Sequence, residues 1–211
     1  MMLATRDVRT LKPDQLDALR EVANIGAGHA ATALSTMTGQ SIMINVPTIT
    51  IAHLDEIPGL VVSNPEDAVA VILLQMLGDL TGRSILVFPE HTACRLAEMM
   101  LMRPRGSSPS IALLEQSALK ECGNILSGAY LNALADFMHL MLLPSPPLLA
   151  VDMASAVLSS AFLQFGEGRD VVFCVESEFQ MRDDGDALRG YFLLLPDSGS
   201  LQKILQSINL A

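Results

Sequence analysis

The sequence lacks tryptophan, has few aromatic residues and contains no long apolar run. Aromatic residues make up 4% of the 211 residues and charged residues 17%, whereas half of the residues are apolar. This composition is typical of a folded protein with a sizeable core and excludes a largely disordered chain. Apolar runs such as 69–74 and 140–143 are far shorter than the roughly 20 residues of a membrane-spanning helix. We therefore predict no membrane span.

The chain is also poor in basic residues and lacks an apolar stretch at its amino terminus. It has 13 Lys and Arg against 23 Asp and Glu, which gives a formal net charge of -10. Nucleic-acid affinity comes largely from Lys and Arg that neutralise phosphates, so we expect neither DNA nor RNA as a partner. Without an apolar stretch there is no secretory signal, and we predict a cytoplasmic protein.

Cysteine and histidine are scarce and scattered. The three cysteines, Cys94, Cys122 and Cys174, show no CxxC spacing, and an odd number cannot pair completely, so we expect buried free thiols. No two of the four histidines stand at a spacing that favours a shared metal, and no cysteine lies close to a histidine within the repeat. We predict no metal site in this chain. The histidines are His29, His53, His91 and His139.

The sequence contains an internal repeat at an offset of 100 residues. ALREVANIGAG at 18–28 aligns with ALKECGNILSG at 118–128, and the similarity continues to Pro47 and Pro147. Such self-similarity indicates two copies of one structural unit. We predict a single domain over residues 1–211, made of two pseudo-symmetric halves at about 12–103 and 110–211.

Each half is expected to contain a long helix, a strand after a proline, a hairpin and a second helix. The strand at 147–151 is apolar throughout, whereas that at 47–51 alternates, so we expect the former to be more deeply buried. The predicted fold is α/β, with pseudo-twofold duplicated α-β halves and long helices packed on a largely antiparallel mixed sheet. The remaining predicted elements are helices at 13–38, ended by Gly39, and at 90–102, 110–138 and 198–209, and hairpins of 68–76 with 82–88 and 171–181 with 190–196.

A polar stripe occurs in both copies of the repeat. At about 100° per residue, its four members project within an arc of roughly 60° on a helix. Glycine inside a helix costs about 1 kcal/mol relative to alanine, yet each stripe keeps one. Either the helix packs closely at this glycine, or the bare backbone lets a partner's loop approach, and the spacing favours neither. The stripes are Asp17, Glu21, Asn24 and Gly28, and Ser117, Glu121, Asn124 and Gly128.

A carboxylate with a carboxamide one turn away suits only some chemistries. Asn is neither a nucleophile nor a useful acid or base near neutral pH, so serine-type or thiol-type hydrolysis is not supported. It can donate and accept hydrogen bonds at once, which suits the positioning of water in phosphoryl transfer. A fixed Glu anion can bind a partner's lysine. No glycine loop of phosphate-binding form is present, because 26–28 lies within a predicted helix.

The repeated pattern resembles the signature of the CheC, CheX and FliY phosphatase family. That signature is Asp or Ser, three residues, Glu, two residues, Asn, and then 22 residues to Pro, and this sequence carries it twice. The resemblance extends over nearly all of the chain, and two complete motifs look most like the CheC type. It implies a phosphatase that hydrolyses the aspartyl phosphate of a phosphorylated CheY-like response regulator.

The resemblance also implies roles for the stripe residues. Asn24 or Asn124 would orient the attacking water, and Glu21 or Glu121 would pair with the regulator's lysine. Asp17, Gly28, Ser117 and Gly128 would border the docked regulator. The protein would need no cofactor of its own, because the Mg²⁺ is bound by the regulator.

A second partner is implied by the segment 148–153, which is similar to the family's contact region for the receptor deamidase CheD. Asp152 is the residue that we expect to contribute there. The same segment also fits a buried strand followed by an Asp that caps a helix. Two other functions stay open: a regulatory module that binds CheD or the regulator with little turnover, and a flagellar-switch-associated protein.

Overall fold

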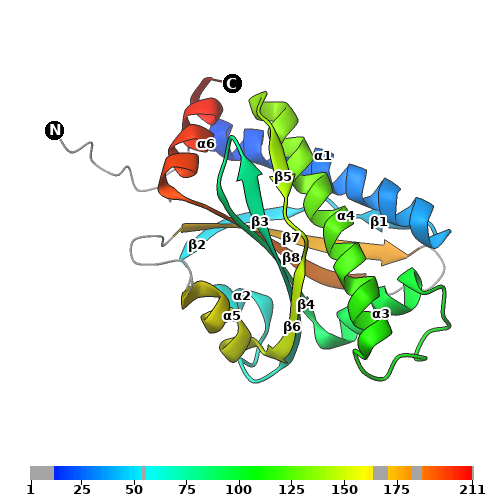
Figure 1. The fold of residues 1–211 in the computed structure, drawn as a ribbon. Helices are drawn as coiled ribbons and strands as arrows, with labels where there is room; N and C mark the ends of the chain where they lie inside the picture. The colour runs from blue at the N-terminus through cyan, green and yellow to red at the C-terminus, as the bar shows by residue number, and fades with distance from the viewer. Residues whose placement is uncertain (1–11, 54–55, 164–170, 182–186, 211) are drawn as a thin grey trace.

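The structure is a computed structural model that describes residues 12–53, 56–163, 171–181 and 187–210. These residues form a mixed α/β fold in which helices cover both faces of an antiparallel sheet (Figure 1). The helices are α1 (Pro13–Thr38), α2 (Ile57–Val61), α3 (Glu90–Met100), α4 (Leu113–Met138), α5 (Ala154–Leu163) and α6 (Ser198–Leu210). The strands are β1 (Ile42–Ile44), β2 (Thr48–His53), β3 (Ala68–Gly78), β4 (Gly82–Pro89), β5 (Leu142–Pro144), β6 (Leu148–Met153), β7 (Val171–Met181) and β8 (Ala187–Pro196).

The sheet joins the two halves of the sequence through strand pairing. Its order is β1-β7-β8-β4-β3-β5, with β2 paired to β7 and β6 paired to β3. At the centre β4 pairs with β8, and Leu86 lies opposite Phe192. At both edges the short strands of one half pair with the first hairpin strand of the other half. The prediction of a largely antiparallel sheet is confirmed, and every pairing among the described strands is antiparallel.

The alternation of the strands separates two apolar cores. Side chains on one face, such as Ile72 and Phe192, pack against α1, α3, α4 and α6. Side chains on the other face, such as Val71 and Leu193, pack with α2 and α5. Because successive residues of a strand point to opposite faces, a long apolar strand such as β3 can serve both cores. The long helices α1 and α4 lie together on the larger core, as Figure 1 shows.

The boundaries of α1 match the prediction, whereas α4 begins later than expected. Pro13 opens α1, where a missing N–H removes no helical hydrogen bond, and Gly39 ends it in the left-handed region at φ 68°. We predicted the second long helix from residue 110, but α4 begins at Leu113. Ser108 does not cap this helix, because its backbone N–H and hydroxyl are bonded to Glu98 and Glu115.

The prediction that residues 147–151 form a deeply buried strand is wrong. Of the six residues of β6, only Leu149 is even half-buried, and Leu148 is 67% exposed. The strand lies at an edge of the sheet with β3 as its paired neighbour, so most of its apolar side chains face solvent. An apolar run alone therefore did not determine burial here.

The remaining predicted elements are found within a few residues of their expected ends. The first hairpin and the last helix of each half are present, although α3 ends at Met100, earlier than predicted. Residues 182–186, which connect the predicted strands 171–181 and 190–196, lie outside the described residues. The short elements β1, β5, α2 and α5 were not predicted. Within the ranges that the structure describes, no helix is long and apolar enough to cross a membrane.

Candidate functional site

The two polar stripes lie on the solvent-facing sides of α1 and α4. Glu21 and Asn24 project opposite to the buried residues Val22 and Ala23 of the same helix, because positions three or four apart share a helix face. Asn24 and Asn124 are half-buried and both Glu side chains are exposed. The other members, Asp17, Gly28 and Ser117, are exposed, and Gly128 is half-buried.

The structure separates the stripe glycines from the glycines that packing requires. A Cβ built on Gly28 or Gly128 would meet no atom within 4 Å, whereas one on Gly26 would lie 2.6 Å from Cδ1 of Tyr130. A Cβ on Gly123 would lie 2.7 Å from Cγ2 of Ile72. Close packing within the described chain therefore explains Gly26 and Gly123 but not the two stripe glycines. Access by a partner, the other explanation considered for these two glycines, stays a prediction.

The two stripes differ in their local hydrogen bonds. On α4, Nδ2 of Asn124 donates to Oε2 of Glu121 at 3.4 Å, a long and therefore weak bond. On α1, Arg20 forms an ion pair with Asp17 at 2.9 Å. Among the described residues, no side-chain hydrogen bond is made by Asn24, and no ion pair or hydrogen bond joins one stripe to the other. The molecule thus presents two separate Glu–Asn pairs.

Neither stripe contains an activated nucleophile. Cys122 and Cys174 are buried, and desolvation raises the pKa of each thiol to about 12, with a smaller contribution from Glu121 and Glu176 respectively. The half-buried Cys94 also has a raised pKa, first because of desolvation and then because of nearby carboxylates. In the described parts of the chain, no group of three or more His, Cys, Asp or Glu side chains could hold a metal ion.

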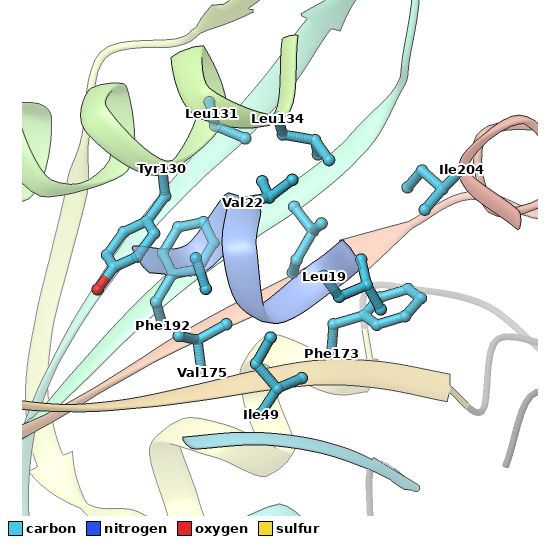
Figure 2. Close-up of a pocket in the computed structure, with 12 residues that line it drawn as sticks. Leu19, Val22, Ile49, Tyr130, Leu131, Leu134, Phe173, Val175, Phe192 and Ile204 are labelled. Carbon is cyan, nitrogen blue, oxygen red and sulfur yellow. The ribbon is translucent and has the colours of Figure 1, made fainter. Parts of the chain in front are cut away.

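An apolar cavity of about 50 Å³ lies beneath α1, on the side away from its stripe. Figure 2 shows Leu19 and Val22 of α1 above Ile49, with Tyr130 to one side and Ile204 of α6 to the other. The Tyr130 hydroxyl is within 2.6 Å of the Ser177 hydroxyl and shares a hydrogen bond with it. The cavity is a gap in the packing under the stripe and has almost no polar lining.

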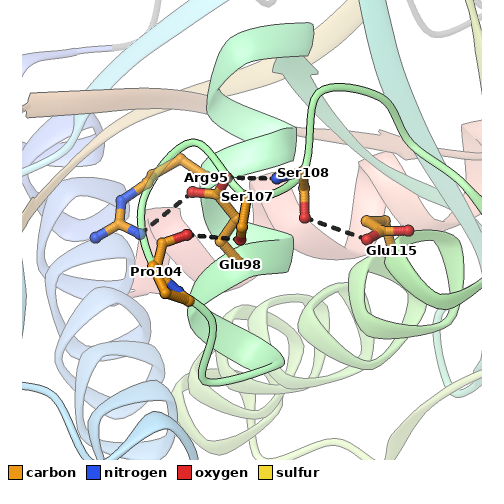
Figure 3. Close-up of polar contacts among 6 residues, drawn as sticks. All are labelled: Arg95, Glu98, Pro104, Ser107, Ser108 and Glu115. Carbon is orange, nitrogen blue, oxygen red and sulfur yellow. Dashed lines mark hydrogen bonds and ion pairs between the residues drawn. The ribbon is translucent and has the colours of Figure 1, made fainter.

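A buried polar cluster, which the sequence analysis missed, holds the first turn of α4 (Figure 3). Glu98 accepts a hydrogen bond from the backbone N–H of Ser108 at 2.9 Å, and Glu115 accepts one from its hydroxyl at 3.1 Å. Arg103 pairs with Glu115 at 2.7 Å. The pKa of Glu115 is lowered, first by its own backbone N–H and then by Ser108 and Arg103, against the opposing effect of burial. The sequence contained one sign of this cluster, namely Glu98 and Glu115 on either side of the segment 103–109.

Comparisons with known proteins identify the family. A model of the CheC-like family matches residues 15–51 and 114–149, which are the two copies of the repeat. The chain is 32% identical over 200 residues to the CheY-P phosphatase CheC of Bacillus subtilis (strain 168), covering 94% of this chain and 95% of that protein. The chain belongs to the CheC-like family.

This CheC-like chain is also similar to FliY and FliM proteins. The flagellar motor switch phosphatase FliY of Bacillus subtilis (strain 168) is 30% identical over 142 residues, 67% of this chain and 36% of that protein. The crystal structure of Thermotoga maritima FliY matches the fold with a TM-score of 0.76 at 21% identity, covering 95% of this chain and 98% of that one. The FliM middle domain from H. pylori matches with a TM-score of 0.65 at 13% identity, covering 93% and 99%. The CheC-like fold is therefore confirmed.

The predicted partner residue Asp152 of this CheC-like chain lies on β6, which belongs to neither stripe. Its Oδ1 accepts a hydrogen bond from the N–H of the next residue, Met153, at 2.8 Å, and α5 begins at Ala154. The alternative of a buried strand before a helix-capping Asp is wrong, because β6 is exposed and this bond does not reach into the helix.

Proposed function

We propose that this protein is a phosphatase that hydrolyses the aspartyl phosphate of a CheY-like response regulator. The relative that matches 94% of the chain is named a CheY-P phosphatase, and the two motifs that carry the resemblance occur at the matched positions. The observation that carries the proposal is the position of two complete Glu–Asn pairs on the solvent-facing sides of their helices, each beside a glycine with open space around it.

In the proposed mechanism, one stripe docks on the regulator and inserts its Asn into the regulator's active site. The carboxamide of Asn24 or Asn124 then accepts and donates hydrogen bonds to hold the attacking water in line with the phosphorus. Positioning of this kind lowers the barrier because the entropy of orienting the reactants is lost before the chemical step. Pairs on the solvent-facing side of a helix fit this role, since a partner can reach them without rearrangement of the core.

The remaining stripe residues are proposed to dock the regulator. Glu21 or Glu121 pairs with the lysine that contacts the phosphate, a charge-assisted bond. Gly28 and Gly128 leave space for a regulator loop next to the Asn, and Asp17 and Ser117 border the contact. The regulator binds the Mg²⁺ that neutralises the phosphoryl charge, so this chain needs no cofactor of its own. Its own residues bind the regulator and orient the attacking water.

The decisive experiment measures the decay of a phosphorylated CheY homologue from the same organism with and without this protein. The intact protein is expected to accelerate decay, and the double variant Asn24→Ala with Asn124→Ala to lose the acceleration by about 100-fold or more. Asn64→Ala, an exposed loop Asn outside both stripes, is the matched control. Full activity of the double variant would disprove the role of the amides. No acceleration by the intact protein would favour the binding or motor functions.

We further propose that β6 is the docking surface for the receptor deamidase CheD. The observation that favours it is an edge strand whose apolar side chains face solvent, with Met153 46% exposed next to the exposed Asp152. Leu148→Ser and Asp152→Ala are expected to weaken binding to CheD in a titration but to leave regulator dephosphorylation unchanged. Unchanged affinity for CheD in both variants would overturn this assignment.

A further inference from the structure

The first turn of α4 has the reverse of an ordinary amphipathic pattern. Leu113 is 85% exposed and Leu114 is 51% exposed, while the neighbouring Glu115 is buried. At the equivalent positions of the first copy, α1 carries Pro13 and Asp14. The two adjacent leucines form a small exposed apolar patch at the start of α4 that the start of α1 lacks.

The exposed leucines are continuous with the stripe on α4. Leu114 precedes Ser117 by three residues and Glu121 by seven, and these separations place all three side chains along one helix face. Leu113 lies one turn before Ser117 on the adjoining side of that face. A regulator that docks over Glu121 and Asn124 would therefore also cover the first turn of α4.

The buried polar cluster fixes the orientation of these leucines. Glu115 is held by the Ser108 hydroxyl and by Arg103, and Ser108 is in turn held by Glu98. These bonds fix the inner side of the first turn, so the outer side is presented to solvent in one orientation. Contacts that are rigid before binding lose less conformational entropy when a partner docks. The equivalent start of α1 has the backbone N–H of Lys12 bonded to the Gln15 side chain and no such buried cluster among the described residues.

We infer that Leu113 and Leu114 form an apolar docking contact for the phosphorylated response regulator, specific to the α4 site. This inference rests on the proposed phosphatase function and deepens it. The occupant is the response regulator that docks on the α4 stripe, because a protein that covers Glu121 and Asn124 can extend along the same helix face to Leu114. The α1 site, bordered by Asp14 and the Asp17–Arg20 ion pair, docks the same regulator without this contact. The two sites thus differ in how they bind the substrate.

The test isolates each site with one Asn substitution. Asn24→Ala leaves the α4 site, and Asn124→Ala leaves the α1 site. Leu113→Ser and Leu114→Ser together are then added to each background, and KM and kcat are measured with the phosphorylated regulator. In the Asn24→Ala background the KM is expected to rise about tenfold with kcat unchanged, since docking contacts act on binding. In the Asn124→Ala background neither parameter is expected to change.

Control variants and measurements distinguish failure of this inference from failure of the proposed phosphatase function. Leu143→Ser removes a leucine of similar exposure, 55%, from an edge strand and is expected to change neither parameter. The leucine variants should keep the thermal midpoint of the parent, because both side chains are exposed. An unchanged KM in an active Asn24→Ala background would overturn the inference while the phosphatase stands. Loss of a dimer in sedimentation with unchanged KM would assign the patch to a second copy. No activity in the intact protein would refute the proposed function itself.

Discussion

Gly26 of α1 lies directly against Tyr130 of α4, so that a Cβ built on the glycine would be 2.6 Å from Cδ1 and 3.1 Å from Cα of the tyrosine. The tyrosine cannot simply move away. Its ring stacks on Phe192 with centroids 4.7 Å apart, and its hydroxyl is bonded to Ser177. This contact sets how closely the two stripe-bearing helices approach each other.

Gly26→Ala and Gly28→Ala, only two residues apart, are therefore expected to have opposite effects on stability. The first inserts a methyl group into occupied space and should lower the free energy of unfolding by about 1–3 kcal/mol. The second meets open space and should raise it by up to about 1 kcal/mol, because alanine favours the helix. Urea unfolding of both variants measures this difference. A destabilised Gly28→Ala would show that this glycine has a packing role after all.

Glu115→Gln is expected to destabilise the protein at neutral pH and to change its acid unfolding. The folded pKa of Glu115 lies below its ordinary value of 4.5, so the carboxylate stabilises the fold above that value. This contribution is lost as the pH falls through the folded pKa. Unfolding free energies measured between neutral pH and about pH 3 should fall less steeply for the variant than for the parent. Parallel curves would contradict a role of this carboxylate in acid unfolding.

Val22→Ile is expected to stabilise the protein by filling part of the cavity beneath α1. Val22 lines the cavity, and one additional buried methylene contributes about 0.8 kcal/mol. Val71→Ile, in the buried core on the opposite face, is the control and should be neutral or destabilising. Thermal and urea unfolding of both variants compare the two sites. Equal destabilisation by both would mean that the cavity does not accept the added methylene.

The thiols are expected to differ sharply in their reactivity. Burial raises the pKa of Cys122 and Cys174 to about 12, and the thiolate is the reactive form. In the folded protein at neutral pH a thiol reagent should therefore label only the half-buried Cys94, and that slowly, whereas all three thiols should react after unfolding. Cys94→Ser should abolish labelling of the folded protein. Rapid labelling of Cys122 in that variant would show that α4 opens away from the sheet.

Much of the fold followed from local patterns in the sequence. The repeat, the polar stripes, the limits of α1 and both strands of the first hairpin depend on helix periodicity, strand alternation, Pro13, Gly39 and the turn at 78–82. These signals act over a few residues, so they can be recognised without knowledge of the neighbouring elements. The family resemblance rested on the same short motifs, and the comparisons confirmed it.

The order of residues by itself determined the helices, the hairpins and the two Glu–Asn pairs, because these depend on residue types at short spacing. Only the tertiary structure decided that β6 is exposed, that β2 pairs with β7, and that Gly26 is packed whereas Gly28 is open. It also decided that Glu115 is buried although the two leucines that precede it in α4 are exposed. Burial and strand partners depend on which distant segments come to lie beside a residue, and an apolar or polar run looks the same in the sequence whether or not a neighbour covers it.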